Sequence, residues 1–351
     1  MALNDNVVVA GYYGFQNAGD ELLLLATIQR LKKEHVGHIT VLSQYPEQTH
    51  NAFSVDAISR WNPFRCVQAF LKADRLVLGG GGLLQESTGW GNHFYYLSLV
   101  VLAKLLRCRT ELWSMGIDPI DNIANRWMTR WVLNYFTDSI SVRDRDSFRV
   151  LDGIGVYHRI LTTPDLMMSL ALPESKSISK QERIPSRRIL MALTPWSQRP
   201  GWEHDLGILL DRMIQQLGVT IDLVPFYPLQ DEEICEKVAA LMGREECIVR
   251  RWKQPTELLS WISDYDFVVG MRYHALVLAV LASKPFIGWG YQRKVRSLCQ
   301  DSEQPMWSFE RGWDVDAVYR QISEAWRQRE LLPGRYHERS VKAAHLFLSK
   351  I

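Results

Sequence analysis

The sequence lacks the features that mark membrane-spanning, disulfide-linked and nucleic-acid-binding proteins. Its 5 cysteines are odd in number, widely separated and without a CxxC pair, so neither a disulfide framework nor a zinc site is indicated. The formal net charge is only +2, and no basic run with interleaved aromatics occurs, so a nucleic-acid partner is not expected. The longest apolar stretch, residues 94–106, contains Lys104 and is too short to cross a bilayer, which predicts a buried helix.

Signals for targeting, metal binding and nucleotide chemistry are also missing. The first residues show neither the basic start nor the apolar core of a signal peptide, and we expect a cytoplasmic protein. There is no HExxH motif, no Walker loop and no GxSxG elbow. No metal site is therefore expected.

What is present is a double series of strand-like and helix-like segments in a chain of 351 residues, about twice the usual domain size. Short, nearly continuous apolar runs alternate with helical periodicity, which indicates parallel sheets covered on both faces. The 13 tryptophans are unusual, but composition alone favours core packing over stacking on sugars. Strands are expected at 7–10, 38–42, 75–78, 111–115, 139–142 and 159–161, and again at 188–193, 220–224, 248–249, 267–269 and 285–287.

A polar stretch rich in Ser and Lys, residues 172–187, separates the two series and predicts a linker. We expect an α/β protein with one Rossmann-like domain over 1–173, a second over 186–332, and a final helix within 333–351. Two such domains would face each other across a cleft. Ligands of open parallel sheets bind beyond the carboxyl ends of the strands.

The most informative stretch is Gly270–Ala275, which follows an expected strand and leads into an expected helix. It places Arg272 and His274 at a helix N-terminus, where unpaired N–H groups and the helix dipole favour an anion. Arginine adds a fork for carboxylate or phosphate, and histidine exchanges protons near neutral pH. A lone histidine beside an apolar helix is usually structural, but the helix start and the arginine favour a functional interpretation. The pattern predicts chemistry on a small, multiply charged anion.

Two glycine-rich segments follow strands of the first half. Residues 11–21 carry glycines at G-x-x-G-x-x-x-x-G spacing, which is not a dinucleotide fingerprint. A turn with a capping acid, since Asp20 and Glu21 suit a helix N-terminus, is slightly favoured there over a ligand loop in which Asn17 and Asp20 contact a sugar hydroxyl. The run Gly79–Gly82 has a high conformational-entropy cost, which favours close backbone contact with a ligand or with the opposite domain. Gln85, just beyond, is a candidate to point into the cleft.

Two more basic residues lie near strand ends. Arg143 follows the strand at 139–142, and local pairing with Asp144 or Asp146 is the usual interpretation of such a residue. Its place at the carboxyl edge of the sheet nevertheless favours anion binding, by Arg143 rather than Arg145. Lys294 follows the last expected strand, where spacing alone favours a solvated loop lysine over a cation in the crevice.

Together these clusters resemble the polysaccharide pyruvyl transferase family, in its bacterial cell-wall or surface-polysaccharide branch. Tyr273 departs from the family pattern, since many members carry leucine there, and Gln16 stands where glycine is common. The motifs that carry the resemblance run in one order along the chain: Gly11–Phe15, Asn17–Glu21, Gly79–Gln85, Ser141–Asp144, Pro225–Tyr227 with Gln230 and Asp231, Gly270–Ala275, and Lys294 with Val295.

The resemblance implies a GT-B-like fold and transfer of pyruvate from phosphoenolpyruvate to a saccharide as a ketal, without a cofactor or metal. It implies an acceptor side in the first domain, a donor side in the second, a lipid-linked acceptor, and peripheral association with the inner face of the cell membrane. His274, Arg272 and Lys294 would act in catalysis, with His274 as general acid. By the resemblance, Arg143, Arg272 and His274 would contact phosphoenolpyruvate. The full set of expected substrate-binding residues also contains Tyr273, Gly80, Gly81, Gly82, Asn17, Asp20 and Gln85.

Two other functions remain open. A GT-B glycosyltransferase that uses a nucleotide sugar shares the fold, but no acidic residue placed for a nucleotide ribose is evident near Arg272. A non-catalytic sugar- or anion-binding protein has little use for a proton donor beside an arginine. Phosphate release from phosphoenolpyruvate with a sugar acceptor separates all three.

Overall fold

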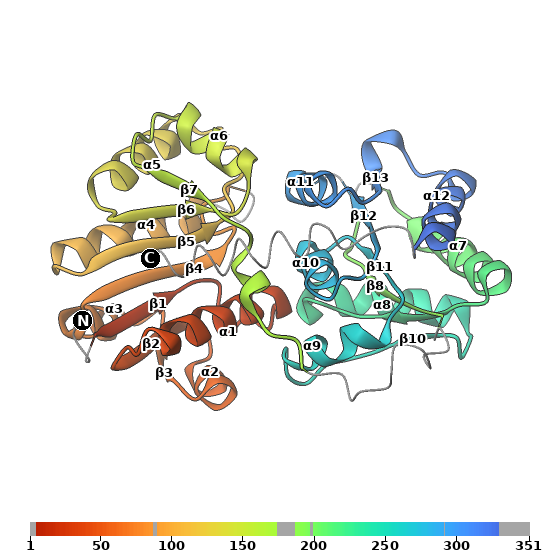
Figure 1. Cartoon of the computed structure of the whole chain (residues 1–351), viewed down its shortest axis with the longest axis horizontal. Helices are drawn as coiled ribbons and strands as arrows, with labels where there is room; N and C mark the ends of the chain where they lie inside the picture. Colours follow the sequence, from red (N-terminus) through yellow and green to blue (C-terminus); the bar gives the residue numbers. More distant parts are fainter. Residues whose placement is uncertain (1–4, 87–89, 174–186, 197–198, 291, 330–351) are drawn as a thin grey trace. The chain divides into compact units, whose positions relative to one another are not determined.

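The computed structural model describes residues 5–86, 90–173, 187–196, 199–290 and 292–329 (Figure 1). The chain forms two compact units that divide between Leu170 and Ala171. Most of the expected linker, and the whole of the helix expected within 333–351, lie outside the described residues. The cleft expected between the domains stays a prediction.

The N-terminal unit contains a seven-stranded parallel sheet of order β3-β2-β1-β4-β5-β6-β7. Its strands are β1 (Asn6–Ala10), β2 (His38–Ser43), β3 (Asp56–Ser59), β4 (Arg75–Gly81), β5 (Arg109–Met115), β6 (Ser139–Val142) and β7 (Ile160–Thr162). Its helices are α1 (Ala18–Lys33), α2 (Pro46–Phe53), α3 (Pro63–Lys72), α4 (Trp90–Leu105), α5 (Ile123–Tyr135), α6 (Arg145–Gly153) and the 3-10 helix η1 (Leu166–Ser169).

The C-terminal unit contains a six-stranded parallel sheet of order β10-β9-β8-β11-β12-β13. Its strands are β8 (Arg188–Ala192), β9 (Thr220–Leu223), β10 (Cys247–Val249), β11 (Phe267–Gly270), β12 (Phe286–Gly290) and β13 (Met306–Ser308). Its helices are α7 (Trp202–Leu217), α8 (Pro228–Met242), α9 (Glu257–Trp261), η2 (Ile262–Asp264), α10 (Tyr273–Leu281), α11 (Arg293–Asp301), η3 (Phe309–Arg311) and α12 (Val315–Gln328).

Both sheets are connected in the same way. The second and third strands are added in turn on one side of the first strand, and the chain then crosses over so that the remaining strands are added on its other side. Each unit is therefore Rossmann-like, with a switch point between β1 and β4 in the first and between β8 and β11 in the second. In such sheets ligands bind at the carboxyl ends of the strands that flank the switch point.

All eleven strands expected from apolar runs are present, with ends that differ from the expected ones by at most three residues; the largest differences are at β4, which continues to Gly81, and at β12, which continues to Gly290. The segment at 94–106 forms most of α4, as predicted. Strands β3 and β13, each at one edge of its sheet, were not expected from the sequence. Both are short and only partly buried, so neither carries the continuous apolar run that marks a central strand.

The cores lie between the sheets and their helices. In the N-terminal unit one cluster joins α3, α4 and α5 to one sheet face through residues such as Phe70, Tyr96 and Leu133. In the C-terminal unit Trp196, Trp202, Trp289, Phe309 and Trp313 pack together. These tryptophans fill the core, as composition favoured.

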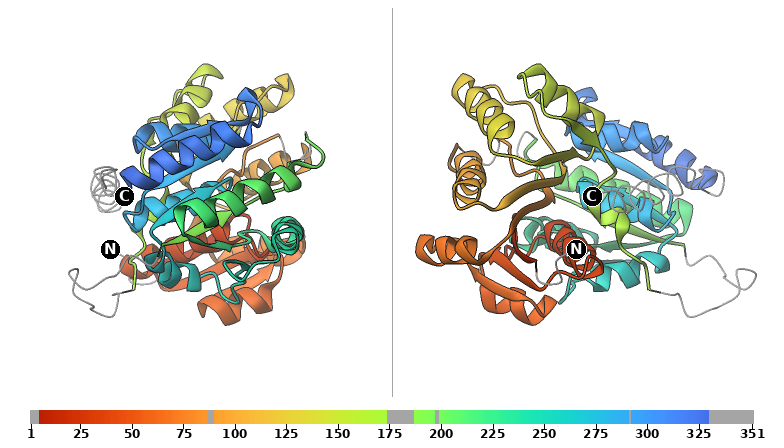
Figure 2. Two further views of the ribbon diagram at one scale, coloured as in Figure 1. Left: turned by 90° about the vertical axis from the view of Figure 1, so that its right-hand side faces the viewer. Right: turned by 60° about the vertical axis from the view of Figure 1, so that its left-hand side comes forward.

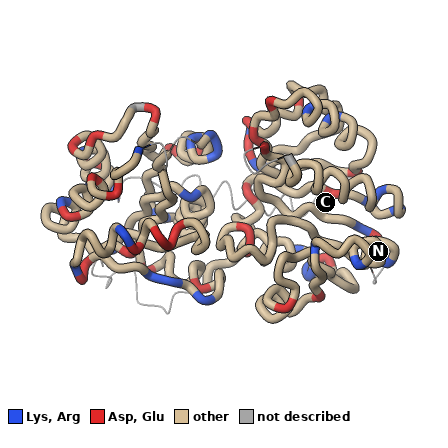
Figure 3. Tube along the Cα trace, turned by 180° about the vertical axis from the view of Figure 1, so that it is seen from behind, with Lys and Arg blue, Asp and Glu red and all other residues tan. Residues whose placement is uncertain are grey.

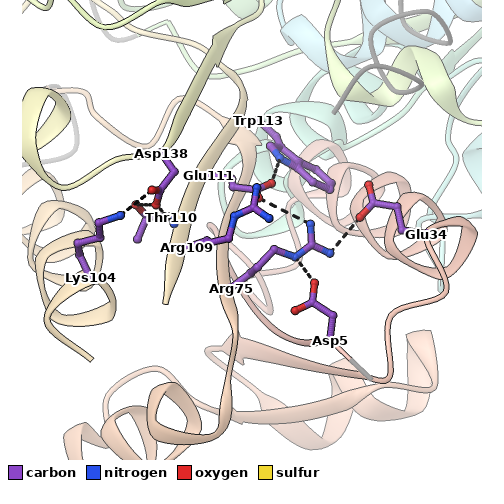
Figure 4. A network of polar contacts seen from close by, with 9 residues as sticks. All are labelled: Asp5, Glu34, Arg75, Lys104, Arg109, Thr110, Glu111, Trp113 and Asp138. Carbon is purple, nitrogen blue, oxygen red and sulfur yellow. Dashed lines mark hydrogen bonds and ion pairs between the residues drawn. The ribbon is translucent and has the colours of Figure 1, made fainter. Parts of the chain in front are cut away.

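The starts of β4 and β5 are tied together by an ion-pair network (Figure 4). Arg75 contacts Asp5 at 2.5 Å, Glu34 at 3.0 Å and the buried Glu111 at 3.7 Å. Trp113 Nε1 donates to Glu111 at 3.1 Å. These charges lie at the amino edge of the sheet and pair with one another, so they hold the fold together.

Candidate functional site

In the C-terminal unit, Arg272 and His274 lie where the sequence predicted, between β11 and α10. Met271 N–H donates to Ala192 O at 2.8 Å, which ties the end of β11 to the end of β8 at the switch point. Arg272 keeps an extended backbone as the residue before α10. The side chains of Arg272 and His274 are both partly exposed, whereas the rest of α10 is buried. The helix thus presents its first turn, and little else, to a ligand.

The Arg272 guanidinium is held by the first turn of α8. Its Nε donates to the two carboxylate oxygens of Asp231 at 3.1 and 2.9 Å, and its Nη2 donates to Asp231 at 2.5 Å and to Gln230 Oε1 at 2.9 Å. Tyr227 lies under the guanidinium at 5.7 Å from Cζ to ring centroid, and its N–H donates to Asp231 at 2.8 Å. Nη1 of Arg272 makes no hydrogen bond to any described residue. The arginine is therefore fixed, with one corner of its fork available.

Asp231 has no exposed surface. Burial raises the pKa of its carboxyl, and Arg272, the Tyr227 N–H and Thr194 oppose the rise. Sequence reasoning did not assign Asp231 a role, although the residue stands in a motif that carries the family resemblance. Its signal was an acid in the first turn of a helix that follows a buried strand. Only the fold shows that this acid reaches Arg272 across the end of β8.

Lys294 and Tyr273 flank this turn. Lys294 lies in the first turn of α11, after β12, so it belongs to a helix and not to the loop that spacing alone favoured. Strands β11 and β12 are paired neighbours, with Gly270 opposite Gly288, so Arg272 and Lys294 follow adjacent strands at one sheet edge. Tyr273 is buried, and its ring meets that of His274 edge-on at 5.2 Å.

In the N-terminal unit, the loop after β1 is organised by Glu21. Gly14 adopts a φ of +79°, and its N–H donates to Glu21 Oε1 at 2.7 Å. Burial raises the pKa of Glu21 to about 7, with a further rise from Asp20, against hydrogen bonds from the loop N–H groups. The capped turn expected from the sequence is present, but its cap is Asn17, which accepts from Gly19 N–H at 3.1 Å, and not an acid. From the sequence, Glu21 is expected only to suit a helix N-terminus, because its contact to a glycine seven residues earlier leaves no spacing signal.

The first two glycines of the run after Leu78 pack inside the unit. A Cβ on Gly79 would lie 2.3 Å from the hydroxyl of Tyr13, which donates to Gly79 O at 2.9 Å. Gly80 has a φ of +80°, in the left-handed region that favours glycine. The fold itself therefore favours glycine at these two positions. The close backbone contact with a ligand or with the opposite domain that the sequence favours for this run stays a prediction.

The end of the run meets α1 and its own loop. Gly81 has a φ of +85°, and a Cβ there would lie 3.1 Å from Oδ1 of the buried Asp20. Gly82 is partly exposed, and Gln85 Oε1 would lie 3.1 Å from its Cβ. The β1 and β4 loops thus meet at Asp20 and Gly81, on the switch point. Ligand contact by Gly80, Gly81, Gly82 and Gln85 stays a prediction.

Arg143 is buried at the end of β6, with its backbone N–H donating to Met115 O at 3.0 Å. Its guanidinium lies against Gly116, where a Cβ would stand 2.4 Å from Cζ. It pairs with Asp144 at 3.5 Å, as the local interpretation expected, and with Asp165 at 3.7 Å, which spacing did not indicate.

The neighbouring charged residues face elsewhere. Asp146, the other acid considered as a local partner of Arg143, pairs instead with Arg149 at 2.9 Å. Arg145 is exposed, so of the two arginines it is Arg143 that the sheet edge holds in place. Among the described residues, no group of three or more His, Cys, Asp or Glu side chains is placed to hold a metal ion.

A groove of about 1300 Å³ in the N-terminal unit lies between α2 and α3, over the starts of β1 to β3. It is lined by residues such as His38, Asp56 and Lys72 and contains none of the candidate residues above. The candidate residues of each unit therefore lie at the carboxyl edge of that unit's own sheet and not in this hollow.

Comparison with known proteins places these residues in a family. The family model described as polysaccharide pyruvyl transferase matches residues 17–293, which includes Asp20, Arg143, Asp231 and the Arg272–His274 turn, and ends one residue before Lys294. No curated protein matches the chain.

Solved structures of UDP-N-acetylglucosamine 2-epimerases, and of a protein in complex with UDP and glucose, share the fold. A putative UDP-N-acetylglucosamine 2-epimerase from Listeria monocytogenes is 9% identical, with a TM-score of 0.66 over 97% of this chain and 91% of that one. The UDP-N-acetylglucosamine 2-epimerase from Neisseria meningitidis, solved with UDP-GlcNAc, is 11% identical, with a TM-score of 0.64 over 99% and 98%. Anabaena HepE, solved with UDP and glucose, is 14% identical, with a TM-score of 0.57 over 99% and 95%. At these identities the likeness is one of fold alone, and that fold is GT-B-like.

The family match covers most of the chain and spans both Rossmann-like units, from the cap of α1 to the start of α11. The chain belongs to the polysaccharide pyruvyl transferase family.

Proposed function

We propose that the protein transfers the pyruvyl group of phosphoenolpyruvate to two hydroxyls of one sugar, which forms a ketal and releases phosphate. Family membership supports pyruvyl transfer in polysaccharide synthesis. The observation that carries the choice of donor is Arg272, held through Nε and Nη2 by Asp231 and Gln230 at the N-terminus of α10, with Nη1 available.

The charges suit this donor. Phosphoenolpyruvate carries a carboxylate and a phosphate on the same carbon, so one cation does not neutralise it. Arg272, the N–H groups at the start of α10 and Lys294 supply positive charge from one sheet edge. In this proposal Arg143 contacts the same molecule.

The reaction balances without an oxidant or reductant. His274, as imidazolium, donates a proton to the methylene carbon, and the central carbon gains cationic character. A sugar hydroxyl adds to that carbon and gives up its proton. The bond from carbon to the phosphate oxygen then breaks, and the second hydroxyl adds with loss of its own proton. One proton ends on the new methyl group and the other on phosphate.

The side chains divide the work. General acid catalysis of the kind proposed for His274 typically contributes a factor of about 10² to 10⁴. Arg272 and Lys294 would stabilise the charge that builds on the leaving phosphate. On the acceptor side, Asp20 lies beside Gly81 at the switch point of the first sheet and would accept the sugar proton. The acceptor we propose is a saccharide, in lipid-linked form.

The test measures phosphate release from phosphoenolpyruvate, with 13C NMR of [2-13C]phosphoenolpyruvate to detect the ketal carbon on the acceptor. Arg272→Ala and His274→Ala should each lower turnover by at least about a hundredfold. The matched controls are Arg293→Ala and His204→Ala, whose side chains are exposed in the same unit. Near-normal turnover in either site variant refutes the assignment. Transfer from a UDP-sugar, with no use of phosphoenolpyruvate, would establish the glycosyltransferase instead.

A further inference from the structure

The large apolar side chains that remain exposed are concentrated on three helices of the N-terminal unit. Helix α5 exposes Trp127 at 63%, Trp131 at 42% and Tyr135 at 63%. The others on these helices are Phe64 and Leu71 of α3, Phe94 and Leu105 of α4, and Ile123 of α5, each more than half exposed. Large apolar side chains normally lose such exposure on folding, and contiguous exposed patches mark interaction sites.

The aromatic residues of α5 form an ordered ladder. Ile123, Trp127, Trp131 and Tyr135 recur every four residues and so share one side of the helix. Trp127 and Trp131 stack with ring centroids 6.1 Å apart and planes 3° apart, and Trp131 and Tyr135 lie 6.4 Å apart. Tyr157 extends the ladder edge-on at 6.5 Å from Tyr135. The opposite side of α5 packs into the core, so this ladder faces outward by construction.

The same three helices contain basic residues and no acidic ones. Their sequences include Arg65 and Lys72 in α3, Lys104 in α4, and Arg126 and Arg130 in α5. Over the whole chain 41 basic residues are nearly balanced by 39 acidic ones, and the two kinds are interspersed along both units (Figure 3). The acid-free helices therefore form an electrostatic exception.

The helices share one face of the sheet, and most of their cations are available. The core cluster that joins α3, α4 and α5 places them on the same side of the first sheet, where the right-hand view of Figure 2 shows them in orange to yellow. Arg65, Lys72 and Arg130 are exposed and form no ion pair with a described residue. Aromatic and aliphatic side chains with unneutralised cations thus cover one layer.

We propose that this layer, α3–α4–α5, docks the protein on an anionic lipid bilayer. Tryptophan and tyrosine favour the level of the lipid head groups, and arginine and lysine at that level bind lipid phosphates. No described helix is long and apolar enough to cross a membrane, so the contact would be peripheral. The inference does not depend on the proposed reaction, although a lipid-linked acceptor would be met at the same surface.

The test is sedimentation with vesicles of phosphatidylcholine, with and without phosphatidylglycerol. Wild type should bind the anionic vesicles, with binding that weakens as salt is added, and should leave the neutral ones largely unbound. Trp127→Ala/Trp131→Ala and Arg65→Glu/Arg130→Glu should each weaken binding by about tenfold or more. The control Ile208→Ala/Leu229→Ala removes exposed apolar groups from the C-terminal unit and should change nothing.

Three outcomes overturn the proposal: no binding of wild type, equal binding to both vesicle types, or unchanged binding of both surface variants. Light scattering of the free protein can give a fourth outcome that overturns the proposal. If wild type is a dimer, binds no vesicle, and becomes monomeric in Trp127→Ala/Trp131→Ala, the layer is an interface between two copies. Turnover of a water-soluble acceptor should be the same in wild type and in all these variants, so a failure here is distinguishable from a failure of the proposed reaction.

Discussion

Replacing Asp231 by asparagine separates the placement of Arg272 from the stability of the fold. The carboxylate accepts from Nε and Nη2 of Arg272 in a two-pronged contact. The asparagine in Asp231→Asn keeps one oxygen but sets an NH2 group against the guanidinium, so donor faces donor. Arg272 would still be present in this variant, but its guanidinium would no longer be held in one orientation.

The expected magnitudes differ for activity and for stability. Losing one preorganised charge contact to the reacting anion typically costs a factor of about 10² to 10³, or roughly 3–4 kcal/mol of transition-state stabilisation. Stability should change by less than about 2 kcal/mol, since the Arg272 side chain is 21% exposed and retains some hydration. The raised pKa of Asp231 also argues for a small loss of stability in Asp231→Asn. Because it is raised, its contribution to stability is present below the unfolded pKa and is lost as pH rises through the folded one. At neutral pH the buried, charged carboxylate therefore lowers the free energy of unfolding, and the neutral amide of asparagine removes this unfavourable contribution.

The assay is kcat/KM for phosphoenolpyruvate as a function of pH, beside urea unfolding of the same samples. In wild type, protonation of Asp231 on the acid side should release Arg272 and lower the rate. In Asp231→Asn that acid limb should vanish along with most of the activity. A variant within about threefold of wild-type kcat/KM would refute the positioning role, because the loss expected for such a contact is at least about a hundredfold.

Two further perturbations act in the N-terminal unit. In Gly116→Ala the new Cβ would stand 2.4 Å from Cζ of Arg143, so the guanidinium must move; kcat/KM for phosphoenolpyruvate should fall about tenfold or more, whereas Gly153→Ala, with open space around it, should match wild type. For Glu21, whose folded pKa of about 7 is raised by burial, the contribution to stability is complete below about pH 4.5 and is lost as pH rises through about 7. The difference in unfolding free energy, Glu21→Gln minus wild type, should therefore rise by about 3 kcal/mol from about pH 4 to about pH 8. Urea titrations in which this difference does not change with pH would contradict the buried, uncharged state.

The parts of the fold that sequence could predict were those with a local signal. Central strands such as β4 and β11 are buried on both sides, so they read as continuous apolar runs, and the turn at Arg272 follows from a strand next to a helix. The edge strand β3 was not predicted, because its side chains are only partly buried and form no continuous apolar run.

The contacts that complete the candidate site join residues far apart in the chain. Asp231 is 41 positions from Arg272, and Arg143 pairs with Asp165 through the return of the chain after β7. Spacing carries no information on such pairs; the sheet order decides them. The same holds for Gly79, where the hydroxyl of Tyr13 leaves no room for a Cβ.

A crystal structure with bound phosphoenolpyruvate tests most directly whether Arg143 and Arg272 act on one ligand. We expect the phosphate or carboxylate oxygens to lie within hydrogen-bond distance of both guanidinium groups, with His274 facing the methylene carbon. A donor molecule bound by Arg272 alone, with Arg143 still engaged by Asp144 and Asp165, would contradict the proposed reaction site.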